Sequence, residues 1–326
     1  MKWQTKVDVE APERKQDYHT RFFLLGSCFT ENTGRLLAER KFSSFLNPMG
    51  IQFNPVSMAR VMERLVREMD FAEQELFLHQ GLYRTFDAHS SLSREGAVET
   101  IAVLNGALAK GRKAIADAGV LVLTPGTAIV HRDKQSNRVV ANNHKLSAER
   151  FERTLLTVDE VAQSLQKTIQ LAREKQPALQ VILTLSPVRH SRNGLPANSR
   201  SKAILLEGIW QCKESMNDVA YFPSFEIMMD ELRDYRFYDR DMVHPSQAAI
   251  DHIWERFSQW MFDDETQRLI AEVEDVVRAC NHRLLHPASS DAMMFRKRLA
   301  ERLETMMEKH PHLDFTRELN ALKSEA

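Results

Sequence analysis

The chain is poor in the residues and runs that define several classes of protein. Its 326 residues include only three cysteines, Cys28, Cys212 and Cys280. Their odd number and wide spacing exclude a disulfide framework and match no zinc-binding pattern. No apolar run approaches the roughly 18 residues that a membrane span needs, and the polar N-terminus lacks the apolar segment of a signal peptide. We therefore expect a cytoplasmic protein with reduced thiols and with no metal or cofactor.

An excess of charge of one sign is also lacking. Lysine and arginine total 44 against 45 aspartates and glutamates, which gives a net charge of -1. The composition therefore offers no electrostatic case for binding nucleic acid. Two familiar motifs are missing as well. The absence of G-x-S-x-G excludes a standard α/β-hydrolase, and the absence of G-x-x-x-x-G-K-[ST] excludes a P-loop.

Short apolar runs alternate with helical patterns along the first 262 residues. The runs predict strands buried on both faces, at 22–25, 120–124, 181–185 and, less regularly, 221–228. Apolar residues at helical spacing predict helices from Pro55 to Met69, behind a capping box of Thr157 and Glu160, and over 246–262. Strands that alternate with helices pair in parallel. We predict an α/β fold of three layers over residues 1–262.

Residues 263–326 have a different character. A mixed-charge helical pattern is followed by a Pro-Ala-Ser-Ser break at 287–290 and by a second helical pattern. The apolar residues of this second helix are expected on one side: Met293, Phe295, Leu299, Leu303 and Met306. We predict a helical C-terminal extension that covers part of the sheet, with self-association through its helices as the alternative.

One predicted strand is followed by two adjacent nucleophiles. The run at 22–25 ends in Gly26, and Ser27 and Cys28 come next. Ligands bind at the carboxyl ends of parallel strands, where this turn would lie. A thiol, with a reference pKa of about 8.5, is a stronger nucleophile than a serine hydroxyl. We favour Cys28 over Ser27 as the attacking residue, the alternative being a buried structural cysteine.

A second pattern supplies an acid–base pair. Asp241 and His244 are three positions apart, just before the helix expected from Ser246. In a turn that enters a helix, the carboxylate can hold one imidazole nitrogen while the other faces outward as a base. The same pattern is common at the ends of surface helices. Combined with the turn after the first strand, it predicts a triad of Cys28 or Ser27, His244 and Asp241.

Eight ordered motifs between about residues 20 and 260 resemble one family. They read LLGSCFTEN, NPMGIQFNP, FDAHSSLS, LTPGTAIVHR, VANNHKL, LTLSPVRH, YFPSFEI and DYRFYDRDMVHPS. They resemble the GSCFA family, whose Gly-Ser-Cys-Phe-Ala motif here begins at Gly26 and has Thr30 in place of alanine. That family is similar to the SGNH (GDSL-like) hydrolases. The resemblance implies a three-layer, flavodoxin-like (SGNH hydrolase-like) parallel sheet, and the helical tail falls outside it.

The resemblance also implies roles for single residues. Cys28 takes the place of the nucleophilic serine of SGNH hydrolases, and Ser27 takes that of the neighbouring aspartate. Asp241 and His244 match their last motif. The motif that would supply the oxyanion asparagine is only partly matched, by Gly126-Thr127-Ala128, and Asn142, Asn143 or His144 is the expected substitute. With the glycine that matches the second motif, the implied oxyanion donors are Gly50, Gly126, Thr127 and Asn142.

Further polar residues stand at expected strand ends or in the loops between them. We predict that they line the substrate pocket, the alternative being ordinary turn hydrogen bonds. These residues are His89, Ser90, His144, Arg189 and His190.

The predicted site fits three functions. The default is a hydrolase, an esterase that attacks a small or carbohydrate O-acyl ester through a Cys/Ser-His-Asp triad and an acyl-enzyme. An O-acyltransferase would use the same triad, because only the acceptor of the acyl group differs. A non-catalytic module that binds a glycan or an acylated ligand is the third reading, supported by the missing oxyanion asparagine.

Overall fold

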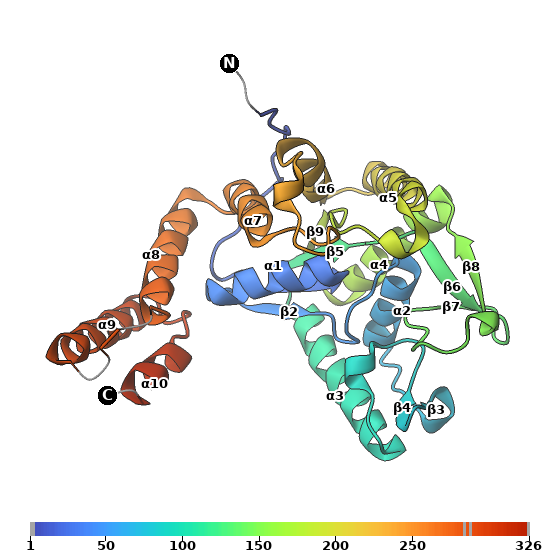
Figure 1. Ribbon diagram of the computed structural model, residues 1–326, viewed down its shortest axis with the longest axis horizontal. Coiled ribbons are helices and arrows are strands. Elements are labelled where there is room, and N and C mark those ends of the chain that lie inside the picture. Colours follow the sequence, from blue (N-terminus) through green and yellow to red (C-terminus); the bar gives the residue numbers. More distant parts are fainter. Residues whose placement is uncertain (1–3, 283–284, 287–288, 325–326) are drawn as a thin grey trace.

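A sheet of five parallel strands forms the centre of the molecule in the computed structural model, which describes residues 4–282, 285–286 and 289–324 (Figure 1). The spatial order is β10-β9-β5-β1-β2. The strands are β1 (Phe22–Gly26), β2 (Ser44–Leu46), β5 (Val120–Thr124), β9 (Gln180–Leu183) and β10 (Val219–Tyr221). Numbered by their order in the chain, these strands run 2-1-3-4-5, as in flavodoxin-like folds. The predicted three-layer α/β fold is confirmed, and the strand order reverses beside β1.

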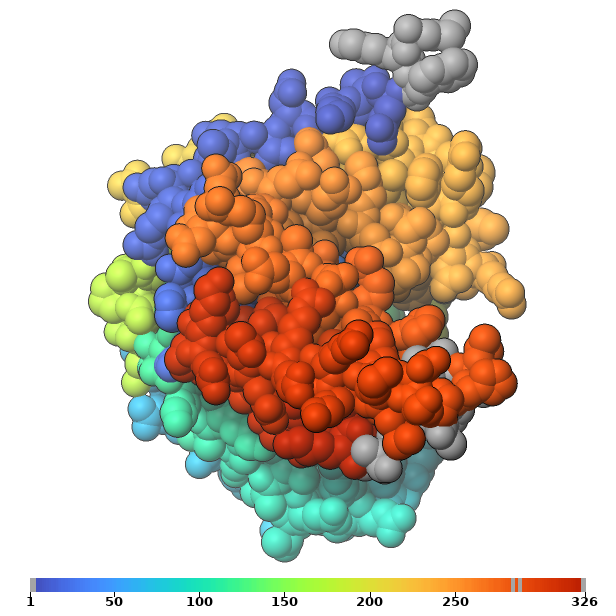
Figure 2. Space-filling model, turned by 90° about the vertical axis from the view of Figure 1, so that its left-hand side faces the viewer, coloured from blue at the N-terminus to red at the C-terminus, as the bar shows by residue number. Residues whose placement is uncertain are grey.

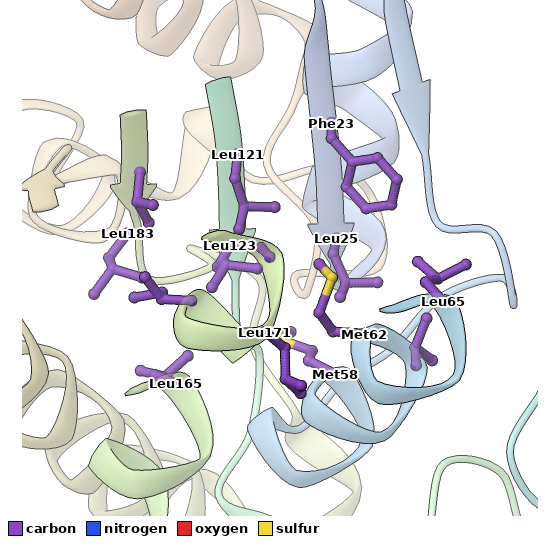
Figure 3. Close-up of a cluster of buried hydrophobic side chains, with 14 of the residues drawn as sticks. Phe23, Leu25, Met58, Met62, Leu65, Leu121, Leu123, Leu165, Leu171 and Leu183 are labelled. Carbon is purple, nitrogen blue, oxygen red and sulfur yellow. The ribbon is translucent and has the colours of Figure 1, made fainter. Parts of the chain in front are cut away.

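One face of the sheet is covered by four helices. They are α2 (Pro55–Val66), α3 (Ala97–Ala116), α4 (Val158–Lys175) and α5 (Leu195–Ser215). Successive strand side chains point to opposite faces, so Leu25, Leu121 and Leu183 face this side. There they pack against Met62 of α2 and Leu165 of α4 (Figure 3).

The opposite face holds a second core. The alternate strand residues Phe22, Leu24 and Val122 point to this side. They pack with Trp254 and Phe257, which belong to α7 (Gln247–Met261), and with the inner side of α1 (Cys28–Glu39). The sheet is thus buried on both faces, as its continuous apolar strands predicted.

Capping side chains set the starts of the predicted helices. The Asn54 side chain accepts the Ser57 N–H at the start of α2, and the capping box of Thr157 and Glu160 opens α4. Ser246 caps α7 in the same way. The predicted end of the first helix is wrong, because α2 stops at Val66 and Met69 lies beyond it with 48% of its surface exposed.

The strand expected over 221–228 is also mostly wrong. β10 ends at Tyr221, and Pro223, two residues later, has no N–H to give to a ladder. The chain then forms α6 (Ser224–Glu226) and a π-helical turn over Ile227–Glu231.

Further strands lie outside the main sheet. They form a hairpin of β3 (Phe77–His79) and β4 (Leu82–Arg84), and an antiparallel sheet of β6 (Ile129–Asp133), β7 (Arg138–Val140) and β8 (Phe151–Leu155).

The C-terminal extension consists of α8 (Asp264–Cys280), α9 (Ser290–Lys309) and α10 (Thr316–Ser324), which lie at one end of the molecule (Figures 1 and 2). Pro287 and Ala288 of the expected break lie outside the described residues. The inner side of α9 carries Leu299, Leu303 and Met306 as predicted, but Met293 and Phe295 are 50% and 38% exposed. Counted back from Leu299, the next buried positions of α9 are Arg296, three residues earlier, and Ala292, four residues before that. Met293 and Phe295 therefore lie off the buried side of the helix.

The extension attaches to the residues that end α1 and follow it. Arg40 pairs with Glu274 of α8 at 2.6 Å, and Lys41 pairs with Glu318 of α10 at 2.7 Å. Phe42 stacks on Phe262, just before α8, with ring centroids 4.5 Å apart. No helix in the described part of the chain is long and apolar enough to cross a membrane.

Candidate active site

The turn after β1 delivers Cys28 to the carboxyl edge of the sheet. At Gly26 a Cβ atom would lie 2.5 Å from the Thr124 carbonyl oxygen, so only glycine allows β1 and β5 to approach this closely. The Ser27 N–H donates to the same carbonyl at 3.0 Å. Cys28 is then the first residue of α1, where N–H groups have no acceptor within the helix.

The loop before α7 brings His244 to the thiol. The Phe237 carbonyl accepts the Ser246 N–H at 2.8 Å, and the His244 carbonyl accepts the Asp239 N–H at 2.8 Å, which closes the loop. Asp241 accepts the N–H groups of Val243 at 2.9 Å and of His244 at 3.0 Å. These two bonds fix the carboxylate against the backbone that carries the imidazole.

Cys28, His244 and Asp241 form a continuous chain of contacts. The Cys28 Sγ lies 3.7 Å from the His244 Nε2, and the His244 Nδ1 lies 2.6 Å from the Asp241 Oδ2. The pKa of Asp241 is lowered to about 2 by hydrogen bonds from the backbone and side chain of His244 and from the Val243 N–H. Ionised Asp241 only accepts, so Nδ1 carries a proton. In the tautomer that has its proton on Nδ1 alone, Nε2 faces the thiol as an acceptor.

Several groups act on the thiol. Burial raises the pKa of Cys28 above its ordinary value. The Lys202 ammonium acts most strongly in the opposite direction, and the N–H groups of Cys28 and Phe29 also lower this pKa, while Glu31 raises it. The same N–H groups, at the positive end of α1, favour any anion that forms beside the sulfur.

Ser27 takes no part in this chain of contacts. It is fully buried, and its Oγ has no hydrogen-bond partner among the described residues. A Cβ atom at Gly126, after β5, would lie 3.0 Å from the Ser27 Cβ and 2.9 Å from the His190 Nε2. Burial, Lys202 and His244 lower the pKa of His190 to about 4, so its ring is neutral near pH 7. The structure thus gathers Ser27, Gly126 and His190 beside Cys28.

The N–H groups expected to bind an oxyanion are already occupied. The Gly50 N–H donates to the Asn47 carbonyl at 2.8 Å within a turn after β2. The N–H groups of Gly126 and Thr127 both donate to the Phe53 carbonyl, at 2.8 and 3.0 Å. Gly50 uses its N–H within its own turn, and Gly126 and Thr127 use theirs for a carbonyl far away in the sequence, so none of the three is a free oxyanion donor in this structure.

The remaining predicted residues after β4 and β7 form a separate cluster. The Asn142 side chain donates to Ser90 Oγ at 3.3 Å and accepts the His144 N–H, so it is not a free oxyanion donor either. The His144 Nε2 lies 2.7 Å from the Thr85 carbonyl, and burial lowers the pKa of this ring to about 4. His89 contacts the hydroxyl of Ser91 instead. The contacts of Asn142 and His144 thus join the loop after β7 to the segment after β4, whereas His89 and Ser91 lie within one turn. That these residues line a substrate pocket stays a prediction.

Arg189 supports the loop of His244. Its N–H donates to the Val243 carbonyl at 3.1 Å, and its guanidinium lies 3.9 Å from the centre of the Tyr238 ring. The predicted pocket residue therefore holds the segment that presents the imidazole.

The sequence reasoning missed Lys202 of α5. Its Nζ donates to the Gly126 carbonyl at 2.9 Å and to the Ser186 carbonyl at 2.5 Å. A signal was present, because Lys202, Leu205, Ile209 and Cys212 follow one another at helical spacing on a buried face. A lysine in such a stripe marks an unusual position.

Comparison with family models identifies the chain. The model of the GSCFA family matches residues 21–257, and that of the GSCFA domain protein, C-terminal domain, matches residues 273–326. The chain belongs to the GSCFA family, and the second match extends the likeness into the helical tail. None of the curated proteins compared matches the chain.

Three solved structures show a weak likeness in fold. A Streptococcus pneumonia protein provisionally described as a platelet activating factor is 13% identical with a TM-score of 0.40, over 74% of this chain and 84% of its own. A carbohydrate esterase family 3 protein from Talaromyces cellulolyticus is 11% identical with a TM-score of 0.32, over 78% and 99%. An acetyl xylan esterase from the rumen bacterium Butyrivibrio proteoclasticus is 11% identical with a TM-score of 0.31, over 81% and 66%.

Proposed function

We propose that the protein is an acyl-ester hydrolase in which Cys28 attacks the ester. The observation that carries this proposal is the pair of contacts at His244, 3.7 Å from its Nε2 to Cys28 Sγ and 2.6 Å from its Nδ1 to Asp241 Oδ2. A nucleophile, a base and a group that orients the base are the parts that acyl transfer requires.

The reaction follows from these positions. The His244 Nε2 takes the thiol proton, and the thiolate adds to the carbonyl carbon of the ester. The N–H groups of Cys28 and Phe29 stabilise the oxyanion. When the adduct collapses, the imidazolium gives its proton to the leaving alkoxide, and the acyl group remains as a thioester on Cys28. Water then adds with His244 as base, which releases the acid and restores the thiol.

The exposure of the site favours substrates with a bulky alcohol part. The side chains of His244 and Asp241 are 47% and 50% exposed, so the leaving alcohol meets solvent rather than a closed cavity. A carbohydrate O-acyl ester fits this arrangement, and we propose it as the substrate class. Acyl transfer to a sugar hydroxyl in place of water uses the same groups, and added alcohol acceptors would reveal it as a new ester product.

The other reading is a ligand-binding module, favoured by the occupied N–H groups of Gly50, Gly126 and Thr127. Hydrolysis of aryl acetates and of acetylated sugars by purified protein separates the two. We expect turnover that Cys28→Ala removes and that Cys280→Ala, a matched change of a half-buried thiol in α8, leaves intact. Unchanged turnover in Cys28→Ala would rule out the proposed nucleophile, and binding of acetylated sugar without turnover would support the module.

A further inference from the structure

Lys202 places an ammonium group beneath the candidate active site. Only 3% of its surface is exposed. Its two carbonyl partners belong to Gly126, after β5, and to Ser186, after β9. Cys28 follows β1, which pairs with β5 in the same sheet. The buried nitrogen is therefore held at the edge where the thiol lies.

This ammonium has no carboxylate partner within the described parts of the chain. A buried charge without a counter-charge is costly, and burial lowers the pKa of Lys202 to about 7. Cys28 acts in the opposite direction and raises this pKa. An anion on the sulfur would therefore supply the charge that the environment of Lys202 lacks.

The other titratable groups around the thiol do not take over this role. His190 is neutral near pH 7, because burial and the charges of Lys202 and His244 lower its pKa to about 4. Glu31 of α1 acts against the thiolate. Asp241 is bound to His244, whose ring receives the thiol proton in the proposed reaction. Lys202, which belongs to α5, is therefore the group that favours the thiolate form of Cys28.

We propose that Lys202 is the counter-charge of the anion that forms at Cys28, and that the protonation of the two residues is coupled. In the protonated form of Lys202 the ammonium keeps its proton, while the thiol proton passes to His244. The ammonium contacts carbonyls rather than substrate, so Lys202 is a positioning residue that acts through the sulfur. The inference rests on the proposed function only in its choice of Cys28 as the nucleophile.

A merely structural lysine would tie the two loops together without needing its charge. Lys202→Gln tests this difference, because the amide keeps a donor for the carbonyls and removes the charge. Lys213→Met is the matched control, since it removes the same charge from the same helix about 16 Å away. Circular dichroism and urea unfolding establish that each variant is folded.

The measurement is the rate at which iodoacetamide alkylates Cys28 as a function of pH, followed by mass spectrometry of the tryptic peptide over residues 22–35. We expect Lys202→Gln to raise the midpoint of this profile by about one pH unit, equivalent to a roughly tenfold slower reaction at pH 7. Lys213→Met should match the wild type. A midpoint that does not move in folded Lys202→Gln would overturn the inference.

A second measurement needs no variant at position 202. Blocking Cys28 of the wild type with methyl methanethiosulfonate removes the sulfur anion, so Lys202 should lose its proton at lower pH, as seen by NMR of lysine labelled with ¹³C at Cε. An unchanged Lys202 titration would contradict the coupling. Neither experiment needs turnover, so an inactive protein with a Lys202-dependent thiol would refute the proposed esterase and retain the inference.

Discussion

Two buried polar clusters in this molecule differ in how completely their charges are paired. In the first, the Asp87 carboxylate forms ion pairs with two arginines of α2, Arg60 at 2.7 Å and Arg64 at 3.1 Å. Arg138 of β7 lies 3.5 Å from the same carboxylate. Burial raises the pKa of Asp87, but the arginines together lower it more, so this pKa lies below its ordinary value. Arg64 also contacts Glu75. Every charge in this cluster has an opposite charge beside it.

The second cluster surrounds Cys28 and is incomplete. Lys202 has carbonyl partners but no carboxylate, and Ser27 Oγ and His190 Nε2 have no hydrogen-bond partners among the described residues. Incomplete pairing costs stability, and such clusters with shifted pKa values gather at functional sites. The comparison shows that the paired cluster holds loops together. On our proposal, the unpaired cluster is organised around the negative charge that forms on Cys28 during the reaction.

The largest expected effect comes from removing the base. His244→Ala should lower kcat/KM on aryl esters by about 10³-fold or more, because no other group takes the thiol proton. The side chain is half-exposed, so unfolding by urea should change little. If His244→Ala kept its kcat/KM within tenfold of the wild type, His244 would not be the base of the reaction.

The paired cluster should show the opposite behaviour. Asp87→Asn leaves Arg60 with no carboxylate partner among the described residues and leaves Arg64 with Glu75 alone, so it should lower the free energy of unfolding by about 3 kcal/mol. The control Asp230→Asn breaks an exposed pair with Arg233 and should cost less than about 1 kcal/mol. Urea titration measures both. Equal small effects would mean that the Asp87 pairing is not structural, and altered alkylation of Cys28 would mean that the clusters are linked.

An intermediate effect is expected from pH. His190 is held at a pKa of about 4 when folded, against about 6.5 when unfolded. Below pH 6.5 the unfolded chain binds a proton that the folded chain excludes, so the free energy of unfolding falls as pH decreases from 6.5 to 4. His190→Gln should show a shallower fall in urea titrations over this range. An equal slope in the two proteins would contradict the assigned burial.

The smallest effect is expected at Ser27. Because its Oγ has no partner among the described residues, Ser27→Ala should change the free energy of unfolding by less than about 1 kcal/mol. Its kcat/KM should stay within a few-fold of the wild type. Loss of activity in a folded Ser27→Ala protein would transfer the attacking role from Cys28 to Ser27.

Sequence periodicity predicted the parts of the fold that repeat. Continuous apolar runs located β1, β5 and β9, and capping residues located the starts of α2, α4 and α7. The strands that were missed are short, as in β2 (Ser44–Leu46), or carry several charged side chains, as in β6 (Ile129–Asp133). Such strands take their conformation from the partners they meet in space, which a local pattern does not contain.

The same limit applies to the candidate site. Cys28, His244 and Asp241 carry recognisable local patterns, and the fold brings them together. The expected oxyanion donors depended on which N–H groups stay free, and the carbonyl groups of Asn47 and Phe53, the second of them distant in the sequence, decide this. Lys202 depends on which face of α5 meets the loops after β5 and β9, so a single sequence marks it only as a lysine in an apolar stripe.

The most direct test of the account is to trap the acyl group. The wild-type protein is mixed with p-nitrophenyl acetate, quenched in acid during the first turnover and digested with trypsin, and the peptide over residues 22–35 is fragmented in the mass spectrometer. This peptide contains both Ser27 and Cys28. The account predicts an acetyl thioester on Cys28 that neutral hydroxylamine removes. Acetyl on Ser27, or turnover with no acetyl on this peptide, would contradict it.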